Sequence, residues 1–459
     1  MKSISRLLFS IFLLLSILTS QSASEAIRLL ENEMGFGARS LGMGGANIAL
    51  GDDPSDMYWN PAGLAGIINK TFYIETNNLN YNNNTTYLDQ TTNNPLQKFG
   101  QFNGFGIAYP IPTVRGSMVV AVGYNRILNY DALMSFSGFS LQDNTLDFPI
   151  NVDGVEKNYK FSKKVQRSEQ VISNGGMEQL TFSFGIAMSS TVSGGISVSR
   201  LTGKEEYEFK FSQEDLQNTY SQFPVDFNQY NLKQSLITKT SGWNIRGGLR
   251  SSLNNWLRFG ISLSLPYTIH VEEQHGTDEK LTFDNGDEFR DATGTGYYDY
   301  KIQAPLIGDV GMALTSENLA ISASLRFKDW GATEFKLNNL SRNSDDYALL
   351  EEENSVLTFQ YRSVVQLRVG VEYLKEFNDS FGITFRAGGG LIPSPDGDSK
   401  VDKSYTTIGL GIPIGNAIML DAAYIFSQWE KKSRDWYTPA GATEEVQSDR
   451  LLVNFSYLF

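Results

Sequence analysis

The sequence predicts an all-β membrane protein, a transmembrane β-barrel of about fourteen antiparallel strands. Three observations lead to this fold class: an N-terminal export signal, the lack of any later apolar run of membrane-spanning length, and apolar residues at every second position. An exported chain without a spanning helix crosses a bilayer only as a closed barrel, because neighbouring strands then satisfy each other's backbone hydrogen bonds.

The first element is a secretory signal peptide, which we place at residues 1–24. Lys2 and Arg6 give it a positive start, residues 7–18 are almost entirely apolar, and a zone of small residues follows. The apolar stretch is shorter than the ~20 residues of a spanning helix. Cleavage after Ser22, Ser24 or Ala26 fits the pattern equally well. The chain has no Cys, so lipid attachment at cysteine and disulfides are both excluded.

Composition narrows the class of partner. The net charge of −13 argues against nucleic-acid binding, which needs a basic surface. The mean hydropathy of −0.26 would fit a soluble protein, but the polar lumen and loops of a barrel carry charge as well.

The strands follow from alternation, most clearly at the C-terminus. Leu451, Val453, Phe455, Tyr457 and Phe459 share one face, and such an aromatic ending resembles the insertion signal of outer-membrane barrels. The last strand of a secreted β-sandwich would alternate too. The expected strands are 70–80, 102–111, 116–127, 177–189, 192–203, 236–252, 255–271, 297–315, 318–330, 356–375, 379–391, 404–413, 417–428 and 447–459.

The connections between these strands alternate between short and long. Short turns are expected to face the periplasm, and long polar loops, such as 128–176, 204–235 and 272–296, the cell exterior. A sandwich has no reason to separate its connections in this way. Aromatic residues fall at strand ends, where an interfacial girdle would lie. They are Tyr73, Tyr109, Tyr124, Trp243, Trp256, Tyr267, Trp330, Tyr373 and Trp429. We therefore expect a multi-pass barrel of the cell outer membrane.

Residues 35–66, "GFGARSLGMGGANIALGDDPSDMYWNPAGLAG", precede the first strand and are glycine-rich and acidic. This segment resembles the N-terminal hatch of the long-chain fatty-acid outer-membrane transporter family (FadL/TodX type). The matching hatch residues are Gly42, Gly44, Gly45, Asn60, Pro61 and Ala62. The resemblance implies a 14-stranded barrel (70–459) plugged by a hatch (25–69), which carries fatty acids or aromatic hydrocarbons across the outer membrane.

A plug must fit closely against the barrel wall. Gly42, Gly44 and Gly45 permit close backbone approach and positive φ, and Pro61 biases Asn60 away from helix. The acids Asp52, Asp53 and Asp56 are expected to pair with cations on the wall, because buried charges need partners. The expected lumen-facing charges are Arg246, Arg250, Arg258, Arg326, Arg368, Glu372, Arg386, Asp421 and Arg450. A phosphate-binding interpretation of the glycines fails, because neither glycine-loop motif is complete.

We expect neither enzyme chemistry nor a cofactor. The two histidines, His270 and His275, are five residues apart and so point to opposite faces of a strand, which disfavours a metal site. No G-x-S-x-G elbow places a serine near a base, and thiol chemistry is impossible.

The function that remains is the binding and passage of a ligand. The resemblance implies an external groove between two loops, a pocket near the mature N-terminus, and a lateral exit at a kink in the third strand. Here the third strand is 116–127, where Gly116 or Gly123 would mark a bulge. The candidate groove residues are Phe209, Phe211, Leu216, Tyr220 and Phe223.

Two functions stay open at this point. The first is passive transport of a hydrophobic small molecule by a monomer embedded in outer-membrane lipid and lipopolysaccharide. The second is a non-transport component that interacts with secreted or surface proteins. A hydrophilic porin is disfavoured, because a plug blocks open diffusion.

Overall fold

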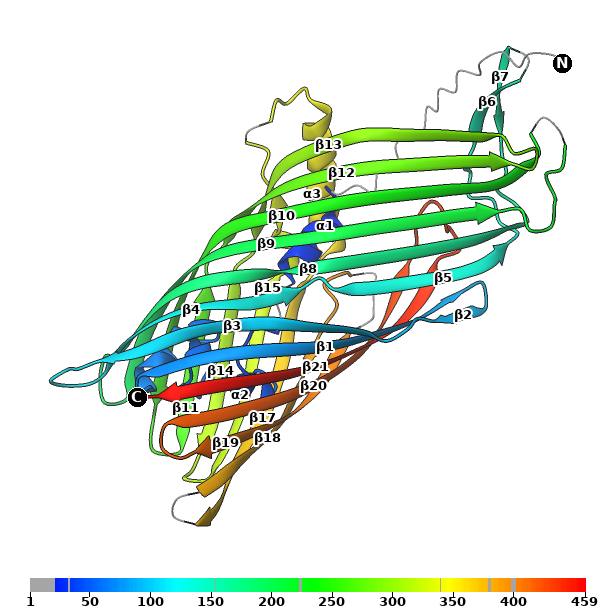
Figure 1. The fold of residues 1–459 in the computed structure, drawn as a ribbon. Helices are drawn as coiled ribbons and strands as arrows, with labels where there is room; N and C mark the ends of the chain where they lie inside the picture. Colours follow the sequence, from blue (N-terminus) through cyan, green and yellow to red (C-terminus); the bar gives the residue numbers. More distant parts are fainter. Residues whose placement is uncertain are drawn as a thin grey trace.

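The computed structural model describes residues 21–31, 34–152, 154–222, 225–338, 340–378, 381–397 and 402–459. Most of the expected signal peptide and the groove residue Phe223 lie outside these residues. The described chain forms the expected closed, 14-stranded antiparallel barrel (Figure 1). It closes where β1 (Thr71–Tyr87) pairs along its length with β21 (Ala442–Leu458), from Thr71 opposite Leu458 to Thr86 opposite Thr443.

The other strands of the wall also pair antiparallel. They are β3 (Gln97–Ile111), β4 (Met118–Asn129), β5 (Ala132–Ser140), β8 (Val165–Ala187), β9 (Val192–Glu214), β10 (Phe227–Ser252), β11 (Leu257–Ser264), β12 (Tyr267–Phe283), β13 (Glu288–Ala304), β14 (Ile307–Thr315), β15 (Leu319–Asp329), β17 (Ser363–Asn378), β18 (Phe381–Ile392), β19 (Lys403–Ile414) and β20 (Ile418–Ser433). Three of the fourteen are interrupted, so that β4 and β5, β11 and β12, and β13 and β14 each make up one strand of the barrel. The minor strands are β2 (Gln90–Asn93), β6 (Phe148–Val152), β7 (Val155–Tyr159) and β16 (Glu334–Phe335).

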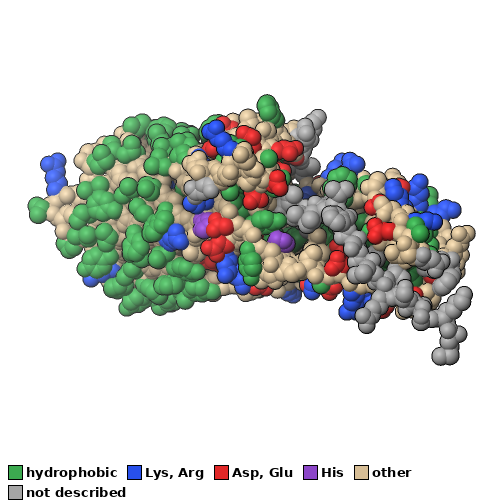
Figure 2. Space-filling model, turned by 90° about the horizontal axis from the view of Figure 1, so that it is seen from above, with side chains coloured by type: hydrophobic (Ala, Val, Ile, Leu, Met, Phe, Trp, Pro, Cys, Tyr) green, Lys and Arg blue, Asp and Glu red, His purple; other side chains and the backbone are tan. Residues whose placement is uncertain are grey.

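The outer wall carries the apolar belt that a membrane-spanning barrel requires. On β11 the exposed residues Phe259, Ile261 and Leu263 alternate with inward ones, and the same pattern recurs around the wall. Figure 2 shows hydrophobic side chains gathered over one half of the molecule, whereas most of the charged side chains lie over the other half. None of the helices in the described part of the chain has the length and apolar character needed to cross a membrane.

The belt lies toward the end with the short turns, called here the short-turn end; the opposite end is the long-loop end. On β10 the belt covers Trp243, Ile245 and Leu249, although the strand begins far earlier, at Phe227. Strands therefore continue beyond the belt for many residues. Beyond the belt the outward face of a strand is polar, and apolar residues such as Phe209 and Phe211 face inward instead. The outward apolar face that marks a membrane strand therefore stops there.

Several strand boundaries differ from those that alternation predicts. Most of 204–235 and 272–296, expected as loops, belongs to β9, β10, β12 and β13, which turn only at 215–226 and 284–287. The expected strands 255–271 and 297–315 are each interrupted, at Pro266 and Pro305, because proline cannot donate to a ladder. Residues 356–360, expected as strand, end the helix α3 (Asp345–Gln360).

Short helices lie inside the barrel (Figure 1). They are α1 (Ala23–Leu30), α2 (Ala38–Gly42) and the 3-10 turns η1 (Pro54–Met57) and η2 (Pro61–Gly66). A third 3-10 turn, η3 (Trp330–Ala332), follows β15. Trp59 and Leu64 of this N-terminal segment are completely buried against the wall. The segment is therefore packed as part of the barrel interior.

Candidate functional site

The glycines of the N-terminal segment touch the wall. Gly44 and Gly45 have φ of +65° and +73°, and a Cβ on Gly44 would lie 2.4 Å from the backbone nitrogen of Gly389 in β18. A side chain at Gly44 is thus excluded both by conformation and by space. Tyr405 donates its hydroxyl hydrogen to the Gly44 carbonyl at 2.8 Å, and Thr407 donates to the Gly42 carbonyl at 3.0 Å.

Asn60 joins the segment to β10. Its side-chain nitrogen donates to the carbonyls of Ile48 (2.7 Å) and Leu249 (3.2 Å), and its side-chain oxygen accepts from Ala62 N at 3.2 Å. Asn60 therefore caps η2, whose first residue is Pro61. The Asn-Pro-Ala stretch satisfies its own backbone while holding the wall.

The hatch acids behave differently from one another. Asp52 pairs with Arg250 (3.2 Å) and approaches Arg258 (3.7 Å). Asp53 and Asp56 instead form a capping box on η1, and Asp56 accepts from Asn47 at 2.8 Å. The expectation that all three acids pair with wall arginines is therefore wrong for Asp53 and Asp56, because local capping satisfies their oxygens first.

Most of the wall arginines pair with wall acids. Asp309 of β14, a residue that the sequence analysis does not single out, forms ion pairs with Arg326 (2.7 Å) and Arg246 (3.0 Å). Arg368 lies 3.8 Å from the same carboxylate. Arg386 bridges Glu372 and Asp421, each at 2.7 Å. All these groups except the half-buried Glu372 are buried, so the network is a rigid polar layer across the barrel.

The N-terminal segment joins this layer through one cation and two rings. Arg39 pairs with Glu372 at 3.0 Å. Arg326 and Arg246 lie over the ring of Tyr58 at 5.7 and 5.3 Å, and Arg368 lies 5.3 Å from the Trp59 ring. Cation–π contacts of this kind are worth more when desolvated. The side chain of Arg450 in β21, by contrast, forms no ion pair with any of the described residues.

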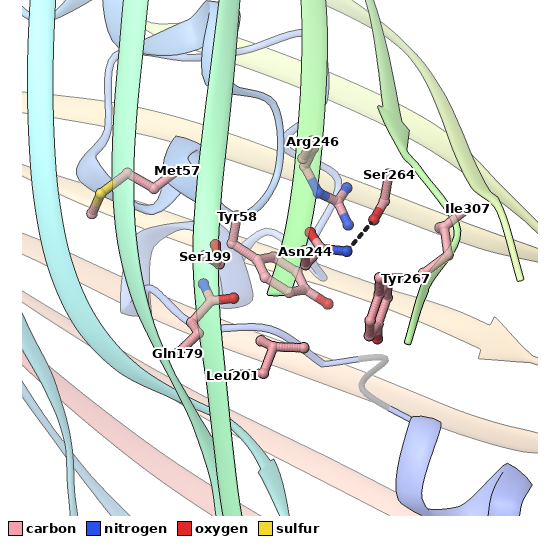
Figure 3. A pocket seen from close by; sticks show the side chains of 10 residues that line it. All are labelled: Met57, Tyr58, Gln179, Ser199, Leu201, Asn244, Arg246, Ser264, Tyr267 and Ile307. Atoms are coloured by element: carbon pink, nitrogen blue, oxygen red, sulfur yellow. Dashed lines mark hydrogen bonds between the residues drawn. The ribbon is translucent and has the colours of Figure 1, made fainter. Parts of the chain in front are cut away.

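A small pocket lies between this segment and the wall (Figure 3). Met57 and Tyr58 form one side, and wall residues from β8 to β14 form the other. Asn244 donates to the Ser264 hydroxyl at 2.6 Å, whereas the side-chain nitrogen of Gln179 has no hydrogen-bond partner within the described chain. The wall residues of the pocket are Gln179, Ser199, Leu201, Asn244, Arg246, Ser264, Tyr267 and Ile307.

Apolar side chains pack together beyond the pocket, toward the long-loop end, and we call this filled apolar region the chamber. It is one contiguous hydrophobic cluster that extends from Trp59 through Leu201 and Tyr267 to Tyr130. The helix α1 fills it with its buried residues Ala26, Ile27, Leu29 and Leu30. Polar contacts hold α1 in place: Arg28 pairs with Glu205, and Lys328 donates to the Leu30 carbonyl at 2.9 Å.

The wall is interrupted beside this chamber. β3 pairs with β4 only from Gly104 opposite Asn125 to Ile111 opposite Met118, and within the described chain no backbone pairing joins residues 97–103 to residues 126–140. A bulge between Arg126 and Leu128 and the end of β4 at Asn129 turn the ribbon away. We call this interruption the wall break.

The wall break has defined edges. Toward the belt it reaches Phe102, which is 49% exposed, and toward the long-loop end it closes where Tyr87 packs on Phe136 at 4.7 Å. Inside, Tyr130 is buried and Arg28 of α1 lies 5.2 Å from its ring. The expected bulge at Gly116 or Gly123 is absent, since Gly116 lies in a turn and Gly123 pairs normally on both sides.

Aromatic residues fill the interior at the long-loop end. Phe161 stacks on Phe227 at 4.6 Å, and Phe211 packs on Tyr437 at 4.9 Å. We call this set the entrance cluster. It comprises Phe148, Ile150, Phe161, Val165, Phe209, Phe211, Phe227, Tyr230, Leu232, Leu281, Phe283 and Tyr437.

The candidate groove residues are divided by this arrangement. Phe209 and Phe211 are buried in the entrance cluster on β9, and Tyr220 packs against it at 5.4 Å from Phe161. Leu216 is 61% exposed and takes no part. The aromatic residues thus come together across strands, rather than along one loop.

A buried carboxylate fastens the loop that carries Tyr437. Glu169 of β8 lies 3.1 Å from the Thr438 hydroxyl, which is also 2.8 Å from Asp435. Burial, with the nearby carboxylate of Asp435, raises the pKa of Glu169 to about 9. Glu444 also faces Glu169, as does the phenol of Tyr207.

This carboxylate makes loop closure dependent on pH. The closed loop holds a protonated Glu169, whereas the open state releases the proton near the ordinary value of ~4.3. Closure is therefore strongest below about pH 4.3 and weakens as pH rises toward 9, by up to about tenfold per pH unit. Hydrogen exchange of residues 434–441, corrected for intrinsic rates, measures this opening. We expect Glu169→Gln to flatten the dependence; an equally steep slope in this variant would contradict the assignment.

Together these features define the class of protein: a membrane-spanning β-barrel plugged by its own N-terminal segment, with an apolar interior beside an interrupted wall. Among solved structures, the chain is similar to the toluene transporter TbuX of Ralstonia pickettii, with 15% identity, a TM-score of 0.54 and coverage of 93% of this chain and 99% of that one. It is also similar to a FadL homologue of Pseudomonas aeruginosa, with 12% identity, a TM-score of 0.57 and coverage of 92% of this chain and 98% of that one. For the toluene transporter TodX of Pseudomonas putida the identity is 13%, the TM-score is 0.54, and the coverage is 93% of this chain and 98% of that one.

At these identities the likeness shows the fold. The fold that the glycine-rich and Asn-Pro-Ala residues imply by resemblance is thereby confirmed. No protein-family model and no curated protein sequence matches the chain. No cluster of three or more potential ligand side chains that could hold a metal ion occurs in the described residues.

Proposed function

We propose that this protein is an outer-membrane transporter that lets hydrophobic compounds, such as long-chain fatty acids or monoaromatic hydrocarbons, diffuse through a plugged barrel. It has no catalytic role in this proposal. The similar structures are named as toluene transporters, a FadL homologue and a monoaromatic hydrocarbon channel, and their fold supports this class of cargo.

The observation that carries the proposal is the contiguous apolar chamber. It extends from the hatch ring Trp59 to Tyr130 at the wall break, so apolar surface lies continuously from the plug to the side of the barrel. An apolar ligand gains about 25 cal/mol per Å² of surface that it removes from water. Such an interior suits a hydrophobic molecule better than an ion or a sugar.

The route has three parts in this proposal. The entrance cluster, with Phe209, Phe211 and Tyr220, collects the compound at the cell exterior. The compound then enters the chamber by replacing the apolar side chains of α1, Ile27 and Leu30. It leaves sideways through the wall break toward the belt residue Phe102. The layer of ion pairs around Asp309 keeps the path below closed to water.

Three further expectations belong to the proposal. Residues 1–24 are the export signal, residues 25–69 the hatch and residues 70–459 the barrel. The barrel functions as a monomer surrounded by outer-membrane lipid and lipopolysaccharide. The alternative, a component that interacts with secreted or surface proteins, is not favoured, because an apolar interior beside a wall break serves no purpose in it.

Deletion of the gene tests the proposal directly. We expect slower growth on long-chain fatty acids or aromatic hydrocarbons, slower uptake of a labelled hydrophobic compound, and unchanged localisation of secreted proteins. Restoring the intact gene provides the control. Normal uptake with a loss of secretion would contradict transport and support the alternative.

A further inference from the structure

The backbone nitrogen of Ala23 faces a carboxylate. Ala23 is the first residue of α1, is 2% exposed, and its nitrogen lies 2.6 Å from Oε2 of Glu353 in α3. The two residues are 330 positions apart in the sequence, yet this contact joins their helices. A distance of 2.6 Å is short for a hydrogen bond donated by nitrogen, and charge on the partners shortens such bonds.

Glu353 has no other partner within the described residues. Burial raises the pKa of its carboxyl, and the adjacent Glu352 raises it further. The helix around it is acidic and has no Lys or Arg. A carboxylate can accept several hydrogen bonds, so one neutral amide donor satisfies Glu353 poorly. A positive charge at the same nitrogen would satisfy it well.

The residues before Ala23 fit the fold less well. Gln21 is 5% exposed, and its side-chain oxygen has no hydrogen-bond partner among the described residues. Leaving such a group buried and unsatisfied costs about 1–3 kcal/mol. Ser22 caps the helix through Glu25 N at 3.2 Å, and its carbonyl accepts from Ala26 N at 3.0 Å, contributions of about 1 kcal/mol each. Removal of the unsatisfied Gln21 offsets part or all of the loss of Ser22.

We propose that the export machinery cleaves the chain between Ser22 and Ala23, and that the new α-ammonium of Ala23 pairs with Glu353. Hydrolysis adds a water hydroxyl to the Ser22 carbonyl carbon, breaks the C–N bond and returns a proton to the Ala23 nitrogen. That amine, with an ordinary pKa near 7.7–8.0, takes up a second proton at neutral pH. Ser22 and Ser20 supply the small residues that signal peptidase needs before the bond. The proposal depends on export and not on transport.

The other two candidate cleavage points do not create this pair. Cleavage after Ser24 or Ala26 removes the Ala23 nitrogen, and with it the donor that Glu353 has in the structure. Cleavage after Ala26 also removes Glu25, which pairs with Arg28. Processing after Ser22 alone leaves α1 whole and turns its first atom into a cation.

The N-terminus of the protein extracted from outer membranes tests the cleavage. Intact mass and N-terminal sequencing are expected to give a mature chain that begins at Ala23. A chain that begins at Gln21, Glu25 or Ile27, or that retains the leader, would overturn the proposal. This outcome is separate from any measurement of uptake.

Labelling of the α-amine tests the ion pair. An amine-reactive reagent near pH 7 modifies the α-amine in preference to lysines, which are protonated there, and mass spectrometry of the N-terminal peptide reads the rate. We expect Glu353→Gln to raise the rate about tenfold and the exposed neighbour variant Glu352→Gln to leave it unchanged. Equal rates in wild type and Glu353→Gln would overturn the pairing.

The wild-type protein alone gives a second measurement, should the variant fail to fold. The pH dependence of labelling reports the pKa of the α-amine. A carboxylate partner raises that pKa above 7.7–8.0, whereas a value at or below this range would overturn the pairing.

Discussion

A covalent bridge across the wall break is expected to reduce uptake of a hydrophobic compound at least about tenfold. Gln101 of β3 and Asn129 at the end of β4 face each other there, with their side-chain amides 3.2 Å apart. The chain has no native cysteine, so Gln101→Cys with Asn129→Cys gives one reactive pair. A short thiol-specific cross-linker would hold the two edges together and close the exit, and a ten-fold loss corresponds to a barrier raised by about 1.4 kcal/mol.

The controls separate blocking from damage. Each single-cysteine variant treated with the same reagent should keep wild-type uptake, and cleavage of a reducible linker should restore uptake in the pair. A second pair, Thr277→Cys with Thr293→Cys, lies on paired strands far from the break and serves as the control for a cross-link that does not close it. Full uptake by the bridged Gln101/Asn129 protein would show that compounds leave by another route.

The second large effect concerns the stability of the barrel. Replacing Asp309 with Asn is expected to lower the free energy of unfolding by about 3–5 kcal/mol, because it removes the carboxylate that Arg246, Arg326 and Arg368 share. The asparagine keeps the size of the side chain, so the loss measures charge rather than a cavity. Urea unfolding in lipid vesicles, followed by tryptophan fluorescence, gives the value.

An exposed acid serves as the matched control for this substitution. Glu317→Gln lies in a turn at the short-turn end and is expected to change stability by less than about 0.5 kcal/mol. In Asp309→Asn the rings of Tyr58 and Trp59 should also become accessible to protease or quencher, since the arginines beneath them lose their orientation. A change below about 1 kcal/mol would mean that the buried layer is not held by Asp309.

The alternation of apolar and polar residues predicted the membrane-facing part of the strands, because it results from lipid on one face and the lumen on the other. Phe259, Ile261 and Leu263 face lipid, and the residues between them face the lumen, so the pattern exists only over the belt. Beyond the belt the outward face is polar and residues such as Phe209 and Phe211 turn inward. The extension of β9 after residue 203 and of β10 before residue 236 therefore lacks the outward apolar face that marks a membrane strand. The helix α3 was missed for a different reason: Leu357, Phe359 and Tyr361 alternate with Thr358 and Gln360, a pattern that suits a strand.

The hatch was predictable in part. The glycines at 42, 44 and 45 and the Asn-Pro-Ala turn carry local conformational requirements, which a sequence displays. Pairing between distant charges does not appear in a sequence, so Asp309 and Arg39 were missed and Asp53 and Asp56 were given partners they do not have. The sequence places the wall break at Gly116 or Gly123, but it lies at the bulge and end of β4, opposite Gly176 of β8, where only tertiary pairing reveals it.

Photo-cross-linking offers the most direct test of the central claim, that a hydrophobic compound passes through the inside of this barrel and out through its wall. A fatty-acid or aromatic probe with a photoreactive group would be added from outside to cells bearing the protein, and the labelled peptides identified by mass spectrometry. We expect labels in the entrance cluster, in the chamber around Tyr267 and along the wall break near Tyr130. Labels confined to the outer belt, with none inside the barrel, would contradict the claim.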